Sequence, residues 1–183
     1  MSIESSEVSN RPPGRILVLT GDGKGKSSSA FGMALRAVGW GQRVCVIQFL
    51  KKATRKTGEE KAARQLGVEW LTLGDGFTWN SPNLDRDRAT CQRIWLLCRE
   101  KITSQHYDLI VLDEINAVLA WEWLPVSDVI HCLQQEKPPQ LHMILTGRDA
   151  PDALISVADT VTEMVSVKHA FQNGVRAVKG IEY

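Results

Sequence analysis

A glycine- and lysine-rich segment, TGDGKGKSS, occupies residues 20–28. Its glycines let the backbone curl so that successive N–H groups face one anion, and a helix starting after it adds its dipole. Lys26 can then reach phosphate oxygens, while Ser27 offers a hydroxyl to Mg²⁺. The usual phosphate loop reads Gly-x-x-x-x-Gly-Lys-Ser, whereas only three residues separate Gly21 from Gly25, so this loop is shorter or differently wound. A glycine-rich turn capped by Ser27 is the alternative, and the two lysines among three glycines argue against it.

Two acids, Asp113 and Glu114, directly follow the apolar run Leu109–Leu112. In open α/β sheets ligands gather at the carboxyl ends of the strands, where a loop after the first strand also lies. The pair therefore predicts a Walker-B-like magnesium site. Adjacent strand side chains point to opposite faces, so we expect only one of the two acids to bind the metal directly. Acids that cap the following helix are the alternative.

Arg148 is a third candidate, in the tripeptide Thr146-Gly147-Arg148 after the apolar run Leu141–Leu145. Its guanidinium could hold a phosphate by a forked contact from the same edge of a sheet. A lone arginine after a strand more often forms a surface salt bridge. The functional interpretation of Arg148 therefore depends on the two preceding motifs.

The elements that position these residues follow from the hydrophobic pattern. Short, partly β-branched apolar runs, typical of buried parallel strands, occur at 16–20, 43–49, 68–73, 108–112, 141–146 and 160–165. Helix-like segments lie between them at 27–38, 59–66, 85–104, 127–135 and 151–157. This alternation implies right-handed crossovers. The expected fold class is α/β, a P-loop NTPase-like (RecA-like), mainly parallel sheet with helices on both faces.

We expect one domain over residues 15–183, preceded by a mobile amino-terminal arm over residues 1–14. The arm is polar and ends in Pro-Pro-Gly, so it has too few apolar side chains to offset the entropy of ordering. Near the other end, Asn173-Gly174 is a turn signal. It favours a terminal hairpin.

Composition excludes several classes of protein. The chain has 22 Lys and Arg against 21 Asp and Glu, a net charge of +1, which gives no footprint for duplex nucleic acid or anionic lipid. Its apolar stretches are far shorter than the roughly 18 residues of a membrane span. The first residues carry acids and serines instead of a secretory signal, so we expect a cytoplasmic protein. Four widely spaced cysteines without a CxxC pair indicate buried, reduced thiols.

Taken in order, several short segments resemble one known family, the P-loop corrinoid adenosyltransferases of the ATP:cob(I)alamin type. They are GDGKGKSS at 21–28, GFTW at 76–79, LDE at 112–114, WLP at 123–125, TGR at 146–148 and VKHAF at 167–171. The resemblance extends from residue 15 to residue 183. It also accounts for the shortened phosphate loop.

The resemblance implies transfer of the 5'-deoxyadenosyl group of ATP to the Co(I) centre of a corrinoid such as cobalamin, with release of the whole triphosphate, in adenosylcobalamin synthesis or salvage. Co(I) is itself the nucleophile, so no protein nucleophile is expected. ATP is the co-substrate and Mg²⁺ the cofactor. The implied ATP-binding residues are Gly21, Asp22, Gly23, Lys24, Gly25, Lys26, Ser27, Ser28, Arg36 and Arg148. The implied metal ligands are Ser27, Asp113 and Glu114.

The resemblance also gives Phe77 and Trp79 a role. They are similar to aromatic residues that occupy the lower face of the corrin and exclude its nucleotide-loop ligand, which makes cobalt easier to reduce. Without the resemblance, both would be interpreted as packing residues under a loop. A homodimer and a flavoprotein reductant are further implications, and no nucleic-acid or membrane partner is expected.

Two other functions share parts of this pattern. A conventional P-loop ATPase or small-molecule kinase would have the same loop and acids, but would release phosphate or transfer only the γ-phosphoryl group. A non-catalytic nucleotide or corrinoid carrier would not need the magnesium acids. A nucleic-acid motor is disfavoured by the net charge of +1. The products formed from ATP separate these alternatives.

Overall fold

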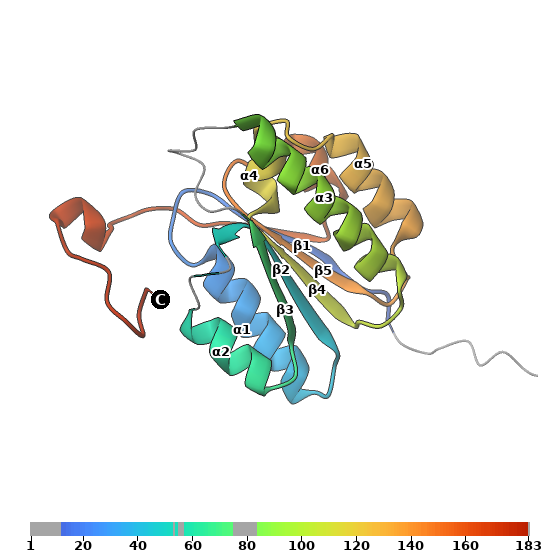
Figure 1. Cartoon of the computed structure of the whole chain (residues 1–183), viewed down its shortest axis with the longest axis horizontal. Coiled ribbons are helices and arrows are strands. Elements are labelled where there is room, and N and C mark those ends of the chain that lie inside the picture. The colour runs from blue at the N-terminus through green and yellow to red at the C-terminus, as the bar shows by residue number, and fades with distance from the viewer. Residues whose placement is uncertain (1–11, 53, 55–56, 75–83, 183) are drawn as a thin grey trace, which may run out of the picture.

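A computed structural model describes residues 12–52, 54, 57–74 and 84–182, which form a six-stranded sheet with helices on both faces (Figure 1). The strands are β1 (Ile16–Thr20), β2 (Val44–Lys52), β3 (Glu69–Gly74), β4 (Leu109–Asp113), β5 (His142–Thr146) and β6 (Thr160–Glu163). The α-helices are α1 (Lys26–Gly39), α2 (Gly58–Gln65), α3 (Leu84–Thr103), α4 (Ile115–Ala120), α5 (Val126–His131) and α6 (Asp152–Val157). A π-helical turn, Cys132–Glu136, continues α5, and a 3₁₀ turn spans Ala170–Asn173.

The strand order is β3-β2-β4-β5-β1-β6, and every neighbouring pair is parallel. All the strands therefore end at the same edge of the sheet. β5 lies between β1 and β4, so the strand before the glycine-rich loop and the strand before the two acids are not neighbours. The predicted α/β class with a parallel sheet is confirmed.

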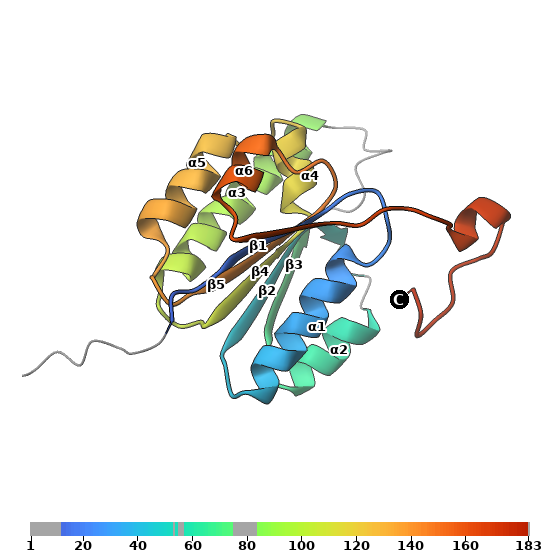
Figure 2. The same cartoon turned by 180° about the vertical axis from the view of Figure 1, so that it is seen from behind.

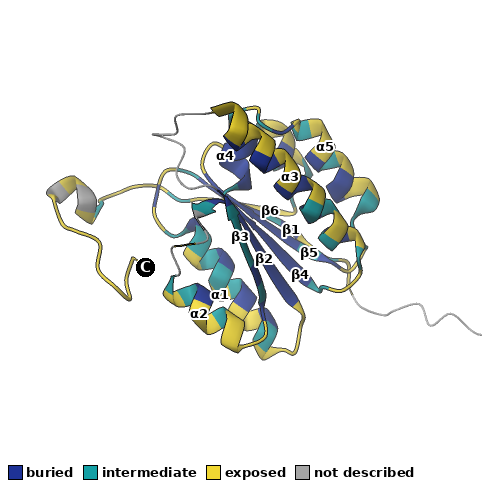
Figure 3. Cartoon of the chain, viewed as in Figure 1, coloured by how far each residue is buried: buried dark blue, intermediate teal, exposed yellow. Residues whose placement is uncertain are grey.

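Helices cover the two faces of the sheet unequally. α1 and α2 lie on one face and α3 to α6 on the other (Figures 1 and 2). α1 approaches the strands closely because its buried positions are the small residues Ala30, Ala34 and Ala37. The central strands are buried, whereas β6 at the edge is exposed along its length (Figure 3). The core thus has two apolar layers, one on each face.

The structure differs from the sequence prediction at two elements. α4 was not predicted, because the residues Ile115–Leu119 are all buried and so show no helical periodicity. The predicted terminal hairpin is wrong: after β6 the described residues form a 3₁₀ turn and further turns, without a strand. These residues are largely exposed, and no neighbouring strand of the described chain pairs with them.

Two predictions from composition can be compared with the described residues. All four cysteines are buried and free, as predicted. None of the helices described has both the length and the apolar character required to cross a membrane.

Residues 1–11 of the predicted arm lie outside the described chain, and Gly14 already donates its N–H to the Pro139 carbonyl at 2.6 Å.

Candidate functional site

The glycine-rich loop connects β1 to α1 at the carboxyl edge of the sheet. Gly21 and Gly25 have φ values of 91° and 120°, which are accessible to glycine and strained for other residues. The segment after β6 forms a wall of the loop, because the Gly23 N–H donates to the Met164 carbonyl at 2.6 Å. A Cβ atom at Gly21 would lie 2.6 Å from that same carbonyl oxygen. Met164 was missed by sequence reasoning, since an apolar residue after a strand carries no chemical signal.

Lys26, the first residue of α1, is folded back into this loop. Its ammonium donates to the carbonyl oxygens of Gly21 at 2.6 Å and Gly23 at 2.8 Å. Lys26 is only 9% exposed. Burial lowers its pKa, and the charge of Glu114 opposes that shift. The loop is therefore wound around a cation that can turn towards a bound anion.

Asp113 is completely buried at the end of β4, and its carboxylate accepts hydrogen bonds from several donors. The side-chain amide of Gln48 at 2.8 Å and the ammonium of Lys51 at 3.0 Å both donate to its Oδ2. The Thr146 hydroxyl donates to its Oδ1 at 2.8 Å. Burial alone would raise the pKa of Asp113, but Lys51 and hydrogen bonds from Ser27, Gln48 and Thr146 lower it overall. Asp113 is thus a buried carboxylate in its ionised form.

Glu114, the next residue, has a different environment. It adopts a left-handed backbone conformation with φ 68°, and its N–H donates to the Thr146 hydroxyl at 3.1 Å. Burial and the neighbouring charge of Asp113 raise the pKa of Glu114. Two adjacent acids whose pKa values shift in opposite directions are suited to different roles. Of the pair, Asp113 has the stronger anionic character.

The loop after β5 lies between the glycine-rich loop and the acid pair and is linked to both by hydrogen bonds. Thr146 contacts Asp113 on β4, and the Asn116 side-chain amide donates to the carbonyls of Leu19 on β1 and Gly147, both at 3.2 Å. Gly147 has φ 134°, and a Cβ atom there would lie 3.0 Å from the backbone nitrogen of Ala117. Asn116 was missed because a single Asn after an acid pair resembles a helix-starting residue.

Two charged residues of the glycine-rich loop form ion pairs with distant parts of the chain. Arg148 lies 3.3 Å from Asp22 in a largely exposed ion pair, so the structure places Arg148 beside the glycine-rich loop in the kind of surface salt bridge given above as the alternative. Lys24 lies 3.6 Å from Glu182. The segment carrying Glu182 projects beyond the sheet and returns towards α1 (Figures 1 and 2). Ser28 lies in the first turn of α1, beside Ser27.

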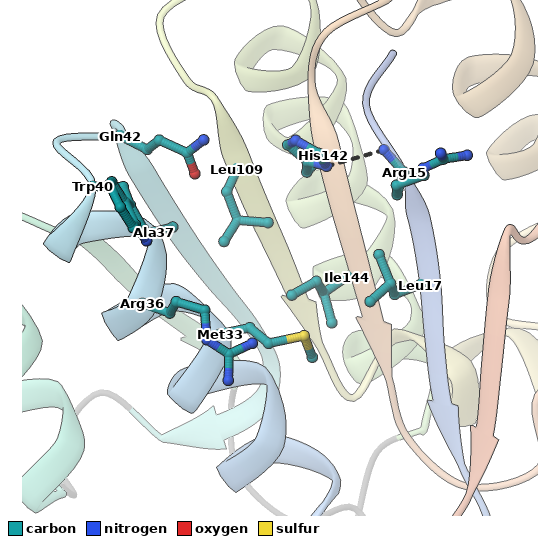
Figure 4. Close-up of a pocket in the computed structure, with 10 residues that line it drawn as sticks. All are labelled: Arg15, Leu17, Met33, Arg36, Ala37, Trp40, Gln42, Leu109, His142 and Ile144. Carbon is teal, nitrogen blue, oxygen red and sulfur yellow. Dashed lines mark hydrogen bonds between the residues drawn. The ribbon is translucent and has the colours of Figure 1, made fainter. Parts of the chain in front are cut away.

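Arg36 is not brought to this site. It follows Lys26 by ten positions on α1, about 15 Å along the helix axis. There it lines a groove of about 270 Å³ at the opposite edge of the sheet, together with Trp40 and His142 (Figure 4). The structure therefore separates Arg36 from the other predicted ATP-binding residues. Phe77 and Trp79 lie outside the described residues.

The donor set at this edge suits a metal that is bound jointly with phosphate. Among the residues described, no group of three or more His, Cys, Asp or Glu could hold a metal ion. Mg²⁺ usually takes one or two carboxylates, with waters and substrate phosphates completing its octahedron. Ser27, Asp113 and Glu114 offer hard oxygen donors of this kind beside the loop. The residues present therefore fit Mg²⁺ carried by a nucleotide.

The fold and the loop together define the class of protein. A parallel sheet with a glycine- and lysine-rich loop after its first strand is the architecture of P-loop NTPase-like proteins. Solved structures with a similar fold include the flagellar accessory protein FlaH of Methanocaldococcus jannaschii (TM-score 0.53, 12% identity, 84% of this chain and 72% of that chain). A KaiC-like protein of Pyrococcus horikoshii is also similar (TM-score 0.53, 15% identity, 85% of this chain and 74% of that chain).

Sequence comparison identifies the family within this class. The family described as "ATP:corrinoid adenosyltransferase BtuR/CobO/CobP" matches residues 13–183. The corrinoid adenosyltransferase of Escherichia coli K12 and the corrinoid adenosyltransferase CobA of Salmonella typhimurium are each 41% identical over 93% of this chain and 86% of their own. The corrinoid adenosyltransferase of Pseudomonas aeruginosa is 43% identical over 93% of this chain and 84% of its own. The chain belongs to the ATP:corrinoid adenosyltransferase family.

Proposed function

We propose that this protein transfers the 5'-deoxyadenosyl group of ATP to the Co(I) centre of a corrinoid. The observation that carries the proposal is the family match over residues 13–183. In this reaction Co(I) attacks C5', a cobalt–carbon bond forms, and the bond between C5' and the triphosphate oxygen breaks. Tripolyphosphate then leaves with the electron pair of that bond. The protein must align cobalt and C5' and stabilise the charge of the leaving group.

The phosphate loop is proposed to hold the triphosphate. Lys26 is close enough to the loop carbonyls to exchange them for phosphate oxygens, and Lys24 and Arg148 border the same loop. Their ion pairs with Glu182 and Asp22 are solvent-exposed and hence weak, so both cations can be redirected to an anion. These three side chains supply the positive charge that departure of triphosphate requires.

Ser27 and Asp113 are proposed to hold the Mg²⁺ that accompanies ATP, with Glu114 beside them. When bound, this ion would neutralise charge on the departing phosphates. Asp113 is the better ligand of the two acids because its pKa is lowered, whereas burial and Asp113 raise that of Glu114. Phe77 and Trp79 are proposed to cover the lower face of the corrin, on the basis of the family resemblance alone.

A homodimer, a cytoplasmic location and a flavoprotein electron donor complete the proposal. The dimer has some support from exposed side chains, because six of the eleven large apolar side chains exposed in the described chain belong to residues 161–181. They include Val167, which is 92% exposed. A concentration of apolar side chains of this kind is typical of an association surface. The location and the electron donor rest on the sequence and the family alone.

The products of the reaction test the proposed activity. Purified protein should convert ATP, MgCl₂ and chemically reduced cobalamin into adenosylcobalamin and tripolyphosphate in equal amounts. Phosphate-specific chromatography and the absorption spectrum of the corrinoid measure the two products. Without adenosylated corrinoid, formation of ADP and orthophosphate would instead show a conventional P-loop ATPase, and formation of ADP and a phosphorylated acceptor would show a kinase.

A further inference from the structure

Lys51 reaches the buried carboxylate of Asp113 because of an irregularity in β2. Gln48 and Lys51 both donate to the same oxygen of Asp113, yet residues three apart on a regular strand point to opposite faces. The pairing of β2 with β3 shifts register between Gln48 and Lys52. Shifts of this kind re-aim side chains and are common beside active sites. Gly74 permits the close approach, since a Cβ atom there would lie 2.1 Å from the Phe49 carbonyl oxygen.

The donors around Asp113 differ in how firmly they are fixed. Gln48 is locked because its side-chain oxygen accepts from the Trp70 indole and the Thr72 hydroxyl, both at 3.0 Å. Thr146 is tied to the backbone of Glu114. Lys51 is instead a long flexible chain, 23% exposed, whose ammonium contacts Asp113 and lies 5.5 Å from the centroid of the Phe31 ring. Of these three donors, Lys51 is charged and is free to withdraw.

From this arrangement we propose that Lys51 is a positioning residue that neutralises Asp113 before ATP binds and gives way to Mg²⁺ when the nucleotide enters. The inference rests on the proposed magnesium role of Asp113. A buried carboxylate needs a positive partner in either state, because an unpaired buried charge is strongly destabilising. Lys51 supplies that charge in the structure described here, and Gln48 and Thr146 keep the carboxylate aimed in both states. Lys51 and Mg²⁺ therefore compete for one carboxylate.

Competition predicts a signature that a merely structural lysine would not give. ATP binding without corrinoid is measured by calorimetry at increasing MgCl₂, so that turnover plays no part. Lys51→Met should lower the half-saturating MgCl₂ concentration by about fivefold or more, since the competing charge is gone. Lys51→Arg should raise it, because a guanidinium grips a carboxylate by two hydrogen bonds. Lys61→Met, which removes an exposed lysine from α2, is the matched control and should leave the titration unchanged.

Thermal unfolding provides a second measurement, which also shows whether a Lys51 variant folds poorly. Lys51→Met should unfold at a lower temperature than wild type without Mg²⁺, and ATP with MgCl₂ should raise its midpoint more than that of wild type. If Lys51→Met cannot be purified, the rise in half-saturating MgCl₂ with Lys51→Arg carries the test. An unchanged or raised magnesium requirement in Lys51→Met, or an unchanged one in Lys51→Arg, would overturn the proposal. If one of these results is obtained and the wild-type protein still forms adenosylcobalamin, the proposed function stands and only the role of Lys51 is rejected.

Discussion

Lys26 illustrates how one side chain can serve both the fold of a loop and its ligand. Its ammonium satisfies two carbonyl groups that would otherwise face inward without a donor, and its position at the start of α1 adds to the positive end of the helix dipole. An anion that enters the loop meets a cation already desolvated, which strengthens their attraction. This arrangement suits the triphosphate that we propose the loop binds.

Replacing Lys26 should separate these two contributions. We expect Lys26→Ala to reduce kcat/KM for ATP at least about 100-fold, the loss typical of a missing charge at a site of developing negative charge. The midpoint of thermal unfolding should fall by only a few degrees, because the lost hydrogen bonds contribute about 1 kcal/mol each. Steady-state kinetics and circular dichroism measure the two effects, with Lys61→Ala as the control. Near-normal kcat/KM in a folded Lys26→Ala protein would remove the loop from the mechanism.

Phe77 and Trp79 provide the test that distinguishes a corrinoid site from any other P-loop site. If they displace the lower ligand of cobalt, replacing both with Ala should impair adenosylation that starts from Co(II) and needs reduction at the enzyme. Activity on chemically supplied Co(I) should fall much less, because the triphosphate site is untouched. Absorption spectra with ATP and Mg²⁺ bound should show Co(II)alamin without its axial ligand in wild type only. Equal conversion by both proteins would make the two aromatics ordinary packing residues.

At the scale of elements, charged contacts hold α3 to the sheet. Lys101 near the end of α3 donates to Glu69 on β3 at 2.7 Å, and the Tyr107 hydroxyl donates to the other oxygen of that carboxylate. Partial burial raises the pKa of Glu69, but Lys101 and Tyr107 lower it overall. The three residues connect the end of α3 with the start of β3 and with the segment just before β4. This contact is remote from the phosphate loop and serves stability.

The stability that the Glu69 carboxylate contributes depends on pH in a definite direction. A carboxylate whose pKa is lower in the folded state stabilises the fold above its unfolded pKa, 4.5 for Glu69, and this contribution is lost as pH falls through the folded value. Glu69→Gln should therefore lower the free energy of unfolding at pH 7 by about 1 kcal/mol, a figure reduced for solvent screening. The difference from wild type should shrink below pH 4.5. Urea unfolding at pH 7, 5 and 4 measures it, and a difference that grows towards acid would contradict the assignment.

In the whole molecule, the segment after β6 carries apolar side chains that a single copy of the chain leaves exposed. Its side chains Val165, Val167 and Ile181 are exposed, whereas the central strands β4 and β5 are almost entirely buried (Figure 3). The ion pair of Lys24 with Glu182 ties this segment back to the body of the protein. In the homodimer that we propose, a second copy of the chain would cover these side chains.

Association of two copies is tested by the mass in solution. Light scattering on a sizing column should give twice the chain mass of 20.4 kDa. Val167→Asp together with Ile181→Asp should shift the protein towards monomer by at least tenfold in dissociation constant, because burying two unpaired charges is costly. Leu96→Asp, at an exposed position on α3, is the matched control. A dimer unaffected by the paired change would place the interface elsewhere.

The local features of this protein could be predicted from its sequence alone. The glycine-rich loop, the strand that precedes it and the acid pair at the end of β4 were recognisable because each depends on residues close together in the chain. The positions of β1 to β5 followed from continuous apolar runs, which are typical of strands buried in a parallel sheet. The family motifs had the same local character. α4 could not be predicted, because a helix buried on all sides shows no periodic alternation of apolar and polar residues.

Which distant residues complete the candidate site depends on how the strands are arranged in space. The strand order puts β5 between β1 and β4, so Thr146 meets Asp113 and Asn116 meets Leu19. A register shift in β2 brings Lys51 to the same carboxylate, and the segment after β6 closes against the loop at Met164. Lys51 and Thr146 also contribute to the lowered pKa of Asp113. Such contacts join residues far apart in sequence, and a local pattern carries no information about which strands will be neighbours.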